Sequence, residues 1–369
     1  MATPLKELYT PQFLAGFTTY LKQVLPDFPD RIFTDRVFSA DWLQLELKGR
    51  IRRISTLLEK LLPGTYERQL HAIVTTVRLM LARPPGKHSI EYLFLPDFVE
   101  QFGTSHPELS LDAMEEITQF ITCEFAIRPF LLKDQGAVLR RMMRWTKHAH
   151  PAVRRLASEG CRPRLPWGTG VPALKKDPSP ILPILEALKE DSSDSVRRSV
   201  ANNLNDIAKD HPLLVVGIAR QWKGQSEHTD WILRHGCRTL LRLADPDIFA
   251  LFGLQQDVCC SVTELHLHSK TVRIGEILEF SFMLIPGAPF PVRLRIDYII
   301  YYRKSGGRHG IKIFRIGERQ FEPGRSRSFK RKQSFADMTT RRHYPGTHRL
   351  AISVNGKEMS SIEFEVTNQ

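Results

Sequence analysis

The spacing of apolar side chains divides the chain into two stretches. From residue 10 to about residue 252, apolar residues recur at helical spacing, in segments that Pro, Gly or Asp interrupts. This pattern predicts helices over residues 10–25, 41–62, 66–82, 90–101, 111–123 and 137–148. After Asp257 the period changes to two, which predicts strands over residues 262–268, 277–285, 294–302, 311–316, 325–334, 348–354 and 361–366.

The middle of the helical stretch repeats itself. Residues 151–159 (PAVRRLASE) resemble residues 194–202 (DSVRRSVAN) at an offset of 43 residues, and residues 232–241 align more weakly with residues 196–205. Helix pairs at a spacing of about 40 residues are typical of HEAT-type solenoids. We therefore predict an all-α HEAT-like repeat domain over residues 1–255.

A stack of helix pairs presents its second helices along one concave surface. In the first two copies this places arginines at one end of a helix, where a row of guanidinium groups could follow phosphates. These residues are Arg154, Arg155, Arg197 and Arg198. The alternative is that they form an ordinary solvated helix end.

The seven predicted strands occupy about 110 residues, which favours an all-β immunoglobulin-like sandwich over residues 257–369. Asn355-Gly356 predicts a tight hairpin turn, because both residues tolerate positive φ angles. Tyr344, just before a predicted strand, is placed like the tyrosine of a tyrosine corner. The expected fold class is thus multidomain, a helical solenoid followed by a sandwich.

The chain of 369 residues carries a net charge of +13, which indicates a polyanionic partner. From Asp257 onward, 19 Lys and Arg stand against 11 Asp and Glu, so the positive charge is concentrated in the predicted sandwich. Double-stranded DNA is the partner we expect, and a merely solubilising surface is the alternative. Candidate DNA-contacting residues in this region are Arg303, Arg308, His309, Arg341 and Arg342.

Several other classes lack their usual signals. The five cysteines include no C-x-x-C pair, and no histidine is spaced with Cys, Asp or Glu as in a metal site. Walker, dinucleotide-binding, H-E-x-x-H and G-x-S-x-G motifs are missing. We expect no cofactor and no metal, no membrane contact, a cytoplasmic, nucleoid-associated location, and a monomer.

Three carboxylates stand on otherwise basic helices: Glu124, Glu159 and Asp206. By residue type alone, each would be a capping, ion-pairing or solvated group. However, residues 154–167 (RRLASEGCRPRLPW) and 195–212 (SVRRSVANNLNDIAKDHP) together resemble the AlkC branch of the HEAT-like-repeat alkylpurine DNA glycosylases. The resemblance is best between about residues 120 and 250, and the appended immunoglobulin-like domain is similar to that of some AlkC members.

The resemblance implies monofunctional excision of N3-methyladenine and N3-methylcytosine, with Glu124, Glu159, Trp167 and Asp206 at the family's active-site motifs. Asp206 is the first candidate for stabilising the sugar cation and activating water, with Glu159 and Glu124 sharing that role or contacting the base. Trp167 would stack on the cationic base, the alternative being a core aromatic residue. The family also implies that the base need not enter a deep pocket.

Two other functions remain open from the sequence. The chain could be a HEAT-repeat scaffold that binds DNA or protein without catalysis, in which case Glu159 and Asp206 would pair with repeat arginines or face the core. It could also be a glycosylase for bulkier adducts, like the related AlkD branch. No lysine stands out as a Schiff-base nucleophile, which argues against strand-cleaving lyase activity.

Overall fold

The computed structural model describes residues 4–82, 90–338 and 341–368. These residues form two compact units. The helical unit comprises the chain up to Val215 together with Gly224–Gly236, and the sandwich unit comprises Val216–Lys223 and the chain from Cys237 onward. The boundary expected at residues 255–257 falls between the last helix and the first strand, and both lie in the sandwich unit.

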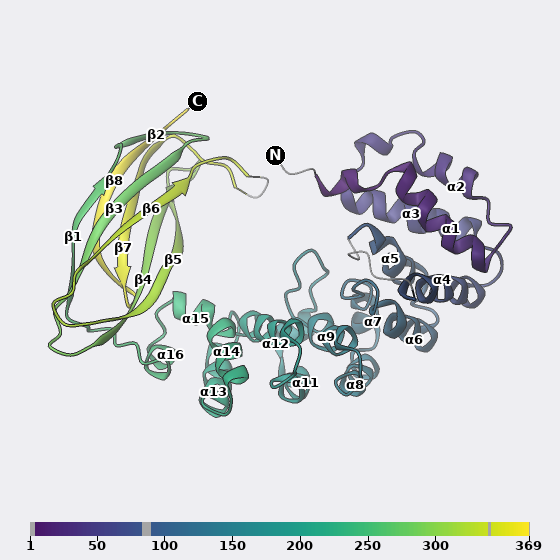
Figure 1. The fold of residues 1–369 in the computed structure, drawn as a ribbon, viewed down its shortest axis with the longest axis horizontal. Coiled ribbons are helices and arrows are strands. Elements are labelled where there is room, and N and C mark those ends of the chain that lie inside the picture. Colours follow the sequence, from purple (N-terminus) through teal and green to yellow (C-terminus); the bar gives the residue numbers. More distant parts are fainter. Residues whose placement is uncertain (1–3, 83–89, 339–340, 369) are drawn as a thin grey trace. The chain divides into compact units, whose positions relative to one another are not determined.

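Helices follow one another along the first part of the chain (Figure 1). Their bounds are α1 Pro11–Val24, α2 Asp30–Val37, α3 Leu47–Leu61, α4 Tyr66–Leu81, α5 Phe94–Phe102, α6 Pro107–Ile117, α7 Arg128–Lys133, α8 Gln135–Trp145, α9 Pro151–Gly160, α10 Pro172–Lys176, α11 Leu182–Leu188, α12 Asp194–Ile207, α13 Pro212–Trp222, α14 Glu227–Gly236, α15 Arg238–Arg242 and α16 Pro246–Leu251.

Most of the expected helices are present, with differences at their ends. The helix predicted over residues 41–62 is instead a short 3-10 turn, Trp42–Gln44, followed by α3. Leu45 between them is extended, and its carbonyl accepts a hydrogen bond from Arg50 Nε at 3.1 Å. A side-chain hydrogen bond thus replaces the helical pattern at this point, and the spacing of apolar residues does not indicate it. The short helix α2 was not predicted.

The two repeated segments are the helices α9 and α12, which pack against each other. Their apolar residues, including Val153 and Val196, are fully buried. Polar groups join the same interface, since Ser158 Oγ donates to Ser199 Oγ at 2.7 Å and Asn203 Nδ2 donates to the Ser158 carbonyl at 2.9 Å. Helix α12 also packs against α14. Successive repeats are thus stacked as in a HEAT-like array.

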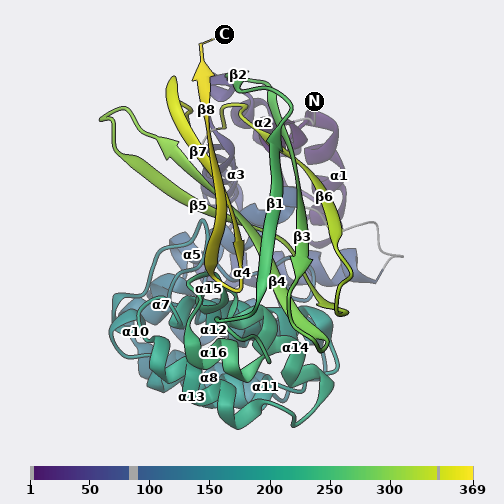
Figure 2. The same ribbon diagram turned by 90° about the vertical axis from the view of Figure 1, so that its left-hand side faces the viewer.

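The strands of the sandwich unit form two sheets, which can be followed in Figures 1 and 2. One sheet has the order β1-β3-β6, and the other has the order β2-β8-β7-β4-β5. All pairs are antiparallel except β2 with β8. The bounds are β1 Cys260–Leu267, β2 Thr271–Arg273, β3 Ile277–Pro286, β4 Val292–Arg303, β5 His309–Phe321, β6 Arg327–Ser334, β7 Gly346–Val354 and β8 Lys357–Thr367.

The seven predicted strands are all present, and the three-residue strand β2 is an addition. Alternating residues of both sheets, such as Leu284, Ile300 and Leu350, bury a common apolar core. Asn355 and Gly356 have φ angles of +44° and +80° and connect β7 to β8, which confirms the predicted hairpin turn. Asn355 is also buried, and its side chain accepts from the Arg295 backbone N–H at 2.7 Å.

The corner before β7 is centred on histidine. His348 is fully buried, and its Nε2 lies 2.9 Å from the carbonyl oxygen of Tyr344. The Phe335 ring packs against His348 and also against His343. Tyr344 is only partly buried and contributes its carbonyl to this corner, so its role differs from that of the tyrosine expected from the sequence.

Candidate functional site

The three carboxylates singled out in the sequence lie in one connected cluster of the helical unit. Glu159 is the next-to-last residue of α9 and Asp206 is the next-to-last residue of α12, and the Arg162 guanidinium joins them. Its Nη1 lies 2.5 Å from Glu159 Oε1, and its Nε lies 2.8 Å from Asp206 Oδ2. Glu159 is 5% exposed and Asp206 1% exposed. Two acids 47 positions apart in the chain are therefore held by one cation.

The third acid joins this cluster through Arg155. Its Nη1 lies 2.8 Å from Glu124 Oε2, and its Nη2 lies 3.8 Å from Glu159 Oε1. Glu124 also accepts a 2.8 Å hydrogen bond from Thr122 Oγ1. The Arg155 side chain is 30% exposed, so solvent reaches this part of the network. The network thus runs from Glu124 to Asp206.

The backbone adds to the negative potential at these acids. Glu159 and Asp206 both stand in the last turn of a helix, where the partial charge of the carbonyl groups is negative. Arg162 and Lys209 offset this charge, with Lys209 Nζ 2.9 Å from Asp206 Oδ1. Burial opposes the charged form of Arg162, but Glu159 and Asp206 outweigh it and raise the pKa of the guanidinium. The cluster is a place where a cation is strongly favoured.

The other repeat arginines serve different purposes. Arg154 makes two hydrogen bonds to the Asp191 carboxylate, at 2.6 and 2.9 Å. Arg197 donates to the carbonyls of Asp191 and Ser192, at 2.6 and 2.9 Å. Both side chains are largely buried. Arg154 thereby links α9 to the turn before α12, whereas Arg197 binds that turn from α12 itself. The row of phosphate-binding guanidinium groups expected from the sequence is therefore not supported at Arg154 and Arg197.

Arg198 differs from them. Its side chain is well exposed and pairs with Asp194, four residues earlier on the same helix, at 2.7 Å. Such exposed pairs stabilise a helix only slightly and exchange readily with other charges. Arg155 and Arg198 therefore remain the candidate DNA-contacting residues of this surface.

Trp167 lies in the loop that follows α9. The side chain is 60% exposed, so Trp167 is not the core aromatic residue that the sequence left as an alternative. Its φ angle is +64°, a left-handed conformation that is costly for a bulky side chain. The loop is fixed to α12 at its start, since Arg162 contacts Asp206 and Arg164 contacts Asp210 at 2.6 Å.

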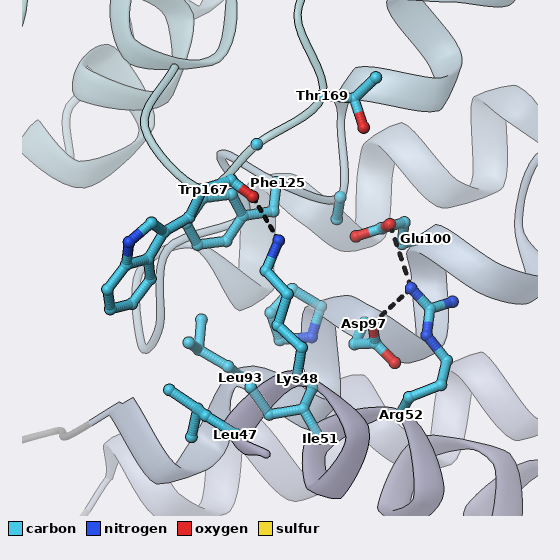
Figure 3. Close-up of a pocket in the computed structure, with 13 residues that line it drawn as sticks. Leu47, Lys48, Ile51, Arg52, Leu93, Asp97, Glu100, Phe125, Trp167 and Thr169 are labelled. Atoms are coloured by element: carbon cyan, nitrogen blue, oxygen red, sulfur yellow. Dashed lines mark hydrogen bonds and ion pairs between the residues drawn. The ribbon is translucent and has the colours of Figure 1, made fainter. Parts of the chain in front are cut away.

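Trp167 also borders a pocket of about 130 Å³ between its loop and helices α3 and α5 (Figure 3). Figure 3 shows Lys48 between an apolar side, with Leu47 and Leu93, and an acidic side, with Asp97 and Glu100. Arg52 pairs with both acids, at 3.1 and 3.3 Å. Burial raises the pKa of both Asp97 and Glu100, and the charge of Asp97 raises that of Glu100 further.

The candidate residues of the sandwich unit gather at one of its ends. Arg303 and His309 face each other across the β4–β5 hairpin, and exposed Arg308 stands at its tip. Arg341 lies over the Tyr302 ring, 5.1 Å from its centroid, and Arg342 beside it is exposed. The structure thus brings together basic residues separated by up to 39 positions in the chain, as their proposed role in binding a phosphate backbone requires.

Sequence reasoning missed three cations that organise the helical site: Lys48, Arg128 and Arg162. Arg162 stands inside the string 154–167 and Arg128 lies four residues after Glu124, but their residue type alone does not distinguish them from surface arginines. Lys48 lies 119 positions before its partner Trp167, and no local pattern indicates that contact.

Within the described ranges, no group of three or more His, Cys, Asp or Glu side chains is arranged to hold a metal ion. In the same residues, no helix is both long and apolar enough to cross a membrane.

Comparison with known proteins places these features in a family. The C-terminal Ig-like domain of the uncharacterised protein YhaZ matches residues 261–368, and the HEAT repeat matches residues 181–211. The uncharacterized protein YhaZ of Bacillus subtilis (strain 168) is 42% identical over 362 residues, covering 98% of this chain and 99% of that protein.

A solved structure is similar over the same length. The Pseudomonas fluorescens alkylpurine DNA glycosylase AlkC, bound to DNA containing an abasic site analog, matches with a TM-score of 0.91 and 35% identity. The match covers 99% of this chain and 100% of that one. With its helical repeats, its Ig-like domain and these full-length relatives, the chain belongs to the AlkC branch of the HEAT-like-repeat alkylpurine DNA glycosylases.

Proposed function

We propose that this protein is a monofunctional DNA glycosylase that removes cationic alkylated bases, N3-methyladenine and N3-methylcytosine, from double-stranded DNA. The observation that carries the proposal is the cluster of Glu124, Glu159 and Asp206 within a chain of the AlkC branch. Double-stranded DNA as partner is supported by the basic end of the sandwich and by the DNA-bound AlkC structure.

The chemistry needs little acid catalysis. A base alkylated at N3 is positively charged, so it is already a good leaving group, and its departure leaves an oxocarbenium-like sugar. Carboxylates held close to that sugar stabilise the developing cation and orient or deprotonate the attacking water. Asp206 is our first candidate for this role, because it is the most buried of the three and is fixed by both Arg162 and Lys209.

The arginines of the cluster have a part in this proposal. Arg155 contacts Glu124 and Glu159 and is partly exposed, so in the free protein it occupies the position of a cation. When DNA binds, a phosphate can draw Arg155 away, and the cationic nucleotide then takes its place beside the acids. Arg162 stays buried and keeps the two helix-terminal acids at a fixed separation.

Trp167 is the third part of the proposed site, after the acids and the arginines. An exposed indole, on a loop fixed to the same helix as Asp206, can stack on a cationic base by cation-π attraction. An uncharged purine gains none of this attraction. Selectivity thus arises from the charge and lability of the damaged base, without a deep pocket around it.

A non-catalytic scaffold is the second candidate, and one observation favours it. Glu159 and Asp206 are buried and paired with an arginine, as structural carboxylates are. In a scaffold, replacement of Asp206 would affect stability alone. The membership of the chain in a glycosylase family favours catalysis.

The decisive experiment is Asp206→Asn. We expect this change to abolish measurable release of N3-methyladenine from methylated duplex DNA. The rate should fall by about 100-fold or more, because one preorganised charge at the sugar is lost. DNA binding should stay near that of the parent chain. Released bases are separated by chromatography, and binding is measured on the same duplex.

The matched control is Asp194→Asn, which removes a carboxylate from the exposed end of the same helix. It should leave release unchanged. Asp206→Asn releasing bases at the parent rate would reject the catalytic assignment, and a parent chain that releases no base would favour the scaffold.

Substrate profiling tests the finer claims. Duplexes carrying N3-methyladenine, N3-methylcytosine or a bulkier adduct are compared at equal concentration. We expect release of the two small cationic bases and intact abasic strands on a denaturing gel. Preferential release of the bulky adduct would indicate an AlkD-like specificity, and strand cleavage would contradict monofunctional action.

A further inference from the structure

Trp167 keeps a strained backbone, so other parts of the helical unit must hold it there. A left-handed φ of +64° costs about 1 kcal/mol for a residue with a side chain. Such strain persists only where surrounding contacts fix it. The loop also packs closely at neighbouring Gly168, because a Cβ there would lie 2.8 Å from Leu165 Cδ2. Two cations bind the carbonyls around these residues.

Arg128 binds the loop from inside. Its side chain is buried, with 1% of its surface exposed, and it binds one backbone carbonyl at the end of α9 and two in the loop. Nε donates to the Thr169 carbonyl, and Nη1 donates to the carbonyls of Gly160 and Arg162, each at 2.7 Å. The start and the end of the loop are therefore tied to one guanidinium, and Trp167 lies between these fixed points.

Lys48 binds the loop from outside. Its ammonium group donates a hydrogen bond to the carbonyl of Trp167 itself (Figure 3). That oxygen belongs to the peptide plane joining Trp167 to Gly168, so the bond fixes the plane's orientation and with it the backbone from which the indole projects. Lys48 comes from α3, in the N-terminal part of the helical unit.

The backbone position of Lys48 is itself fixed. Helix α3 packs against α5, and Arg52, one turn after Lys48, pairs with Asp97 and Glu100 of α5. Ser55 of α3 donates to Asp97, and Gln101 Nε2 donates to Ser55 Oγ at 2.6 Å. The position of Lys48 is thus set by a polar network between two helices, outside the cluster of catalytic candidates.

We propose that Lys48 is a positioning residue that acts on base excision through Trp167, by holding the peptide plane that orients the indole. The inference rests on the proposed function, because it assigns to the N-terminal repeats a share in building that site. Arg128 fixes the loop, and Lys48 fixes the residue at its tip.

A double-mutant cycle tests this inference. Lys48→Met removes the ammonium group and keeps the apolar stem. We expect it to slow single-turnover release at saturating DNA by about three- to tenfold, as the loss of one hydrogen bond would. The Kd for DNA should stay within about twofold of that of the parent chain. In a Trp167→Ala background the same change should cost nothing more, because Lys48 has no indole left to orient. Lys48→Arg, which keeps a donor, should recover part of the rate.

Lys60→Met, at the exposed end of the same helix, is the control for loss of charge and should leave all rates unchanged. Equal losses in both backgrounds, or a weaker Kd with a smaller salt dependence, would mean that Lys48 contacts DNA by itself. Parent-like release by Lys48→Met would also overturn the proposal, as would parent-like release by Trp167→Ala.

A second measurement needs no enzymatic activity. The fluorescence anisotropy decay of Trp167 is isolated by subtracting the Trp167→Phe signal. Lys48→Met should give the indole faster local rotation, and Lys60→Met should not. Unchanged rotation would overturn the positioning role. If rotation changes while neither the parent nor the variants release a base, Lys48 still positions Trp167, but the glycosylase proposal fails and with it the role of Lys48 in excision.

Discussion

At the scale of single residues, Arg128 is a buried cation whose hydrogen bonds within the described residues go to backbone carbonyls. Burial lowers the pKa of its guanidinium to about 10, and one of its nitrogens, Nη2, is buried without a hydrogen-bond partner among the described residues. Carbonyl dipoles compensate the charge in place of a carboxylate. The loop that holds Trp167 is therefore folded around this side chain.

Replacing Arg128 with Met should destabilise the protein by about 2–4 kcal/mol, because three carbonyls lose their donor in a buried place. The free energy of unfolding is measured by urea titration. Arg140→Met, at an exposed position of α8, is the control and should change stability by less than about 0.5 kcal/mol. An equally mild effect of Arg128→Met would show that the loop does not depend on this residue.

At the scale of secondary-structure elements, the start of β7 depends on a neutral histidine. His348 Nε2 contacts the Tyr344 carbonyl at 2.9 Å, and Nδ1 accepts from the Arg303 backbone N–H at 3.4 Å. A protonated ring has no acceptor, so protonation would break the second bond. Burial lowers the pKa of both His348 and neighbouring His343, although Asp337 partly offsets this effect at His343.

These shifts predict that the protein loses stability in mild acid. Above the pKa of an unfolded histidine, near 6.5, both states are neutral and the full stability is present. As pH falls below that value, the unfolded chain takes up protons that the buried rings resist, so the free energy of unfolding decreases. Melting temperatures between about pH 8 and pH 5.5 measure the effect.

His348→Gln should flatten this pH dependence, at a cost in stability at neutral pH. His268→Gln, at an exposed position after β1, should leave the slope unchanged. A parent-like slope in His348→Gln would assign the acid sensitivity to other groups.

At the scale of the whole molecule, positive charge at one end of the sandwich unit is expected to strengthen DNA binding without taking part in the chemistry. Arg308 and Arg342 are both exposed, whereas Arg341 is engaged with Tyr302 and Arg303 packs against Gly346. Contacts of such residues with phosphates are independent of sequence and sensitive to salt.

Replacing Arg308 and Arg342 together with Ser should weaken binding to any duplex and reduce the slope of log Kd against log salt concentration by about 2. The rate of release at saturating DNA should stay unchanged. Arg319 and Arg325, near the opposite end of β5, provide a control double variant with the same loss of charge. Equal effects of the two pairs would indicate a nonspecific influence of net charge.

Features that repeat at short range could be predicted from the order of residues alone. The apolar period predicted α1, α4 and the seven longer strands, because burying one face of a helix or strand imposes its spacing on the chain. The VRR repeats predicted the stacked helices α9 and α12, and the family resemblance selected Glu124, Glu159, Asp206 and Trp167 from many similar side chains.

Which charges meet became clear from the packing of the helices. Arg154 turned out to hold Asp191, whereas Arg155, the next residue, contacts Glu124. Trp167 has a strained φ angle, and its carbonyl accepts a hydrogen bond from Lys48, which lies 119 positions earlier in the chain. Ion pairs and loop conformations of this kind follow from how elements pack in space, and packing leaves no periodic signal in the order of residues.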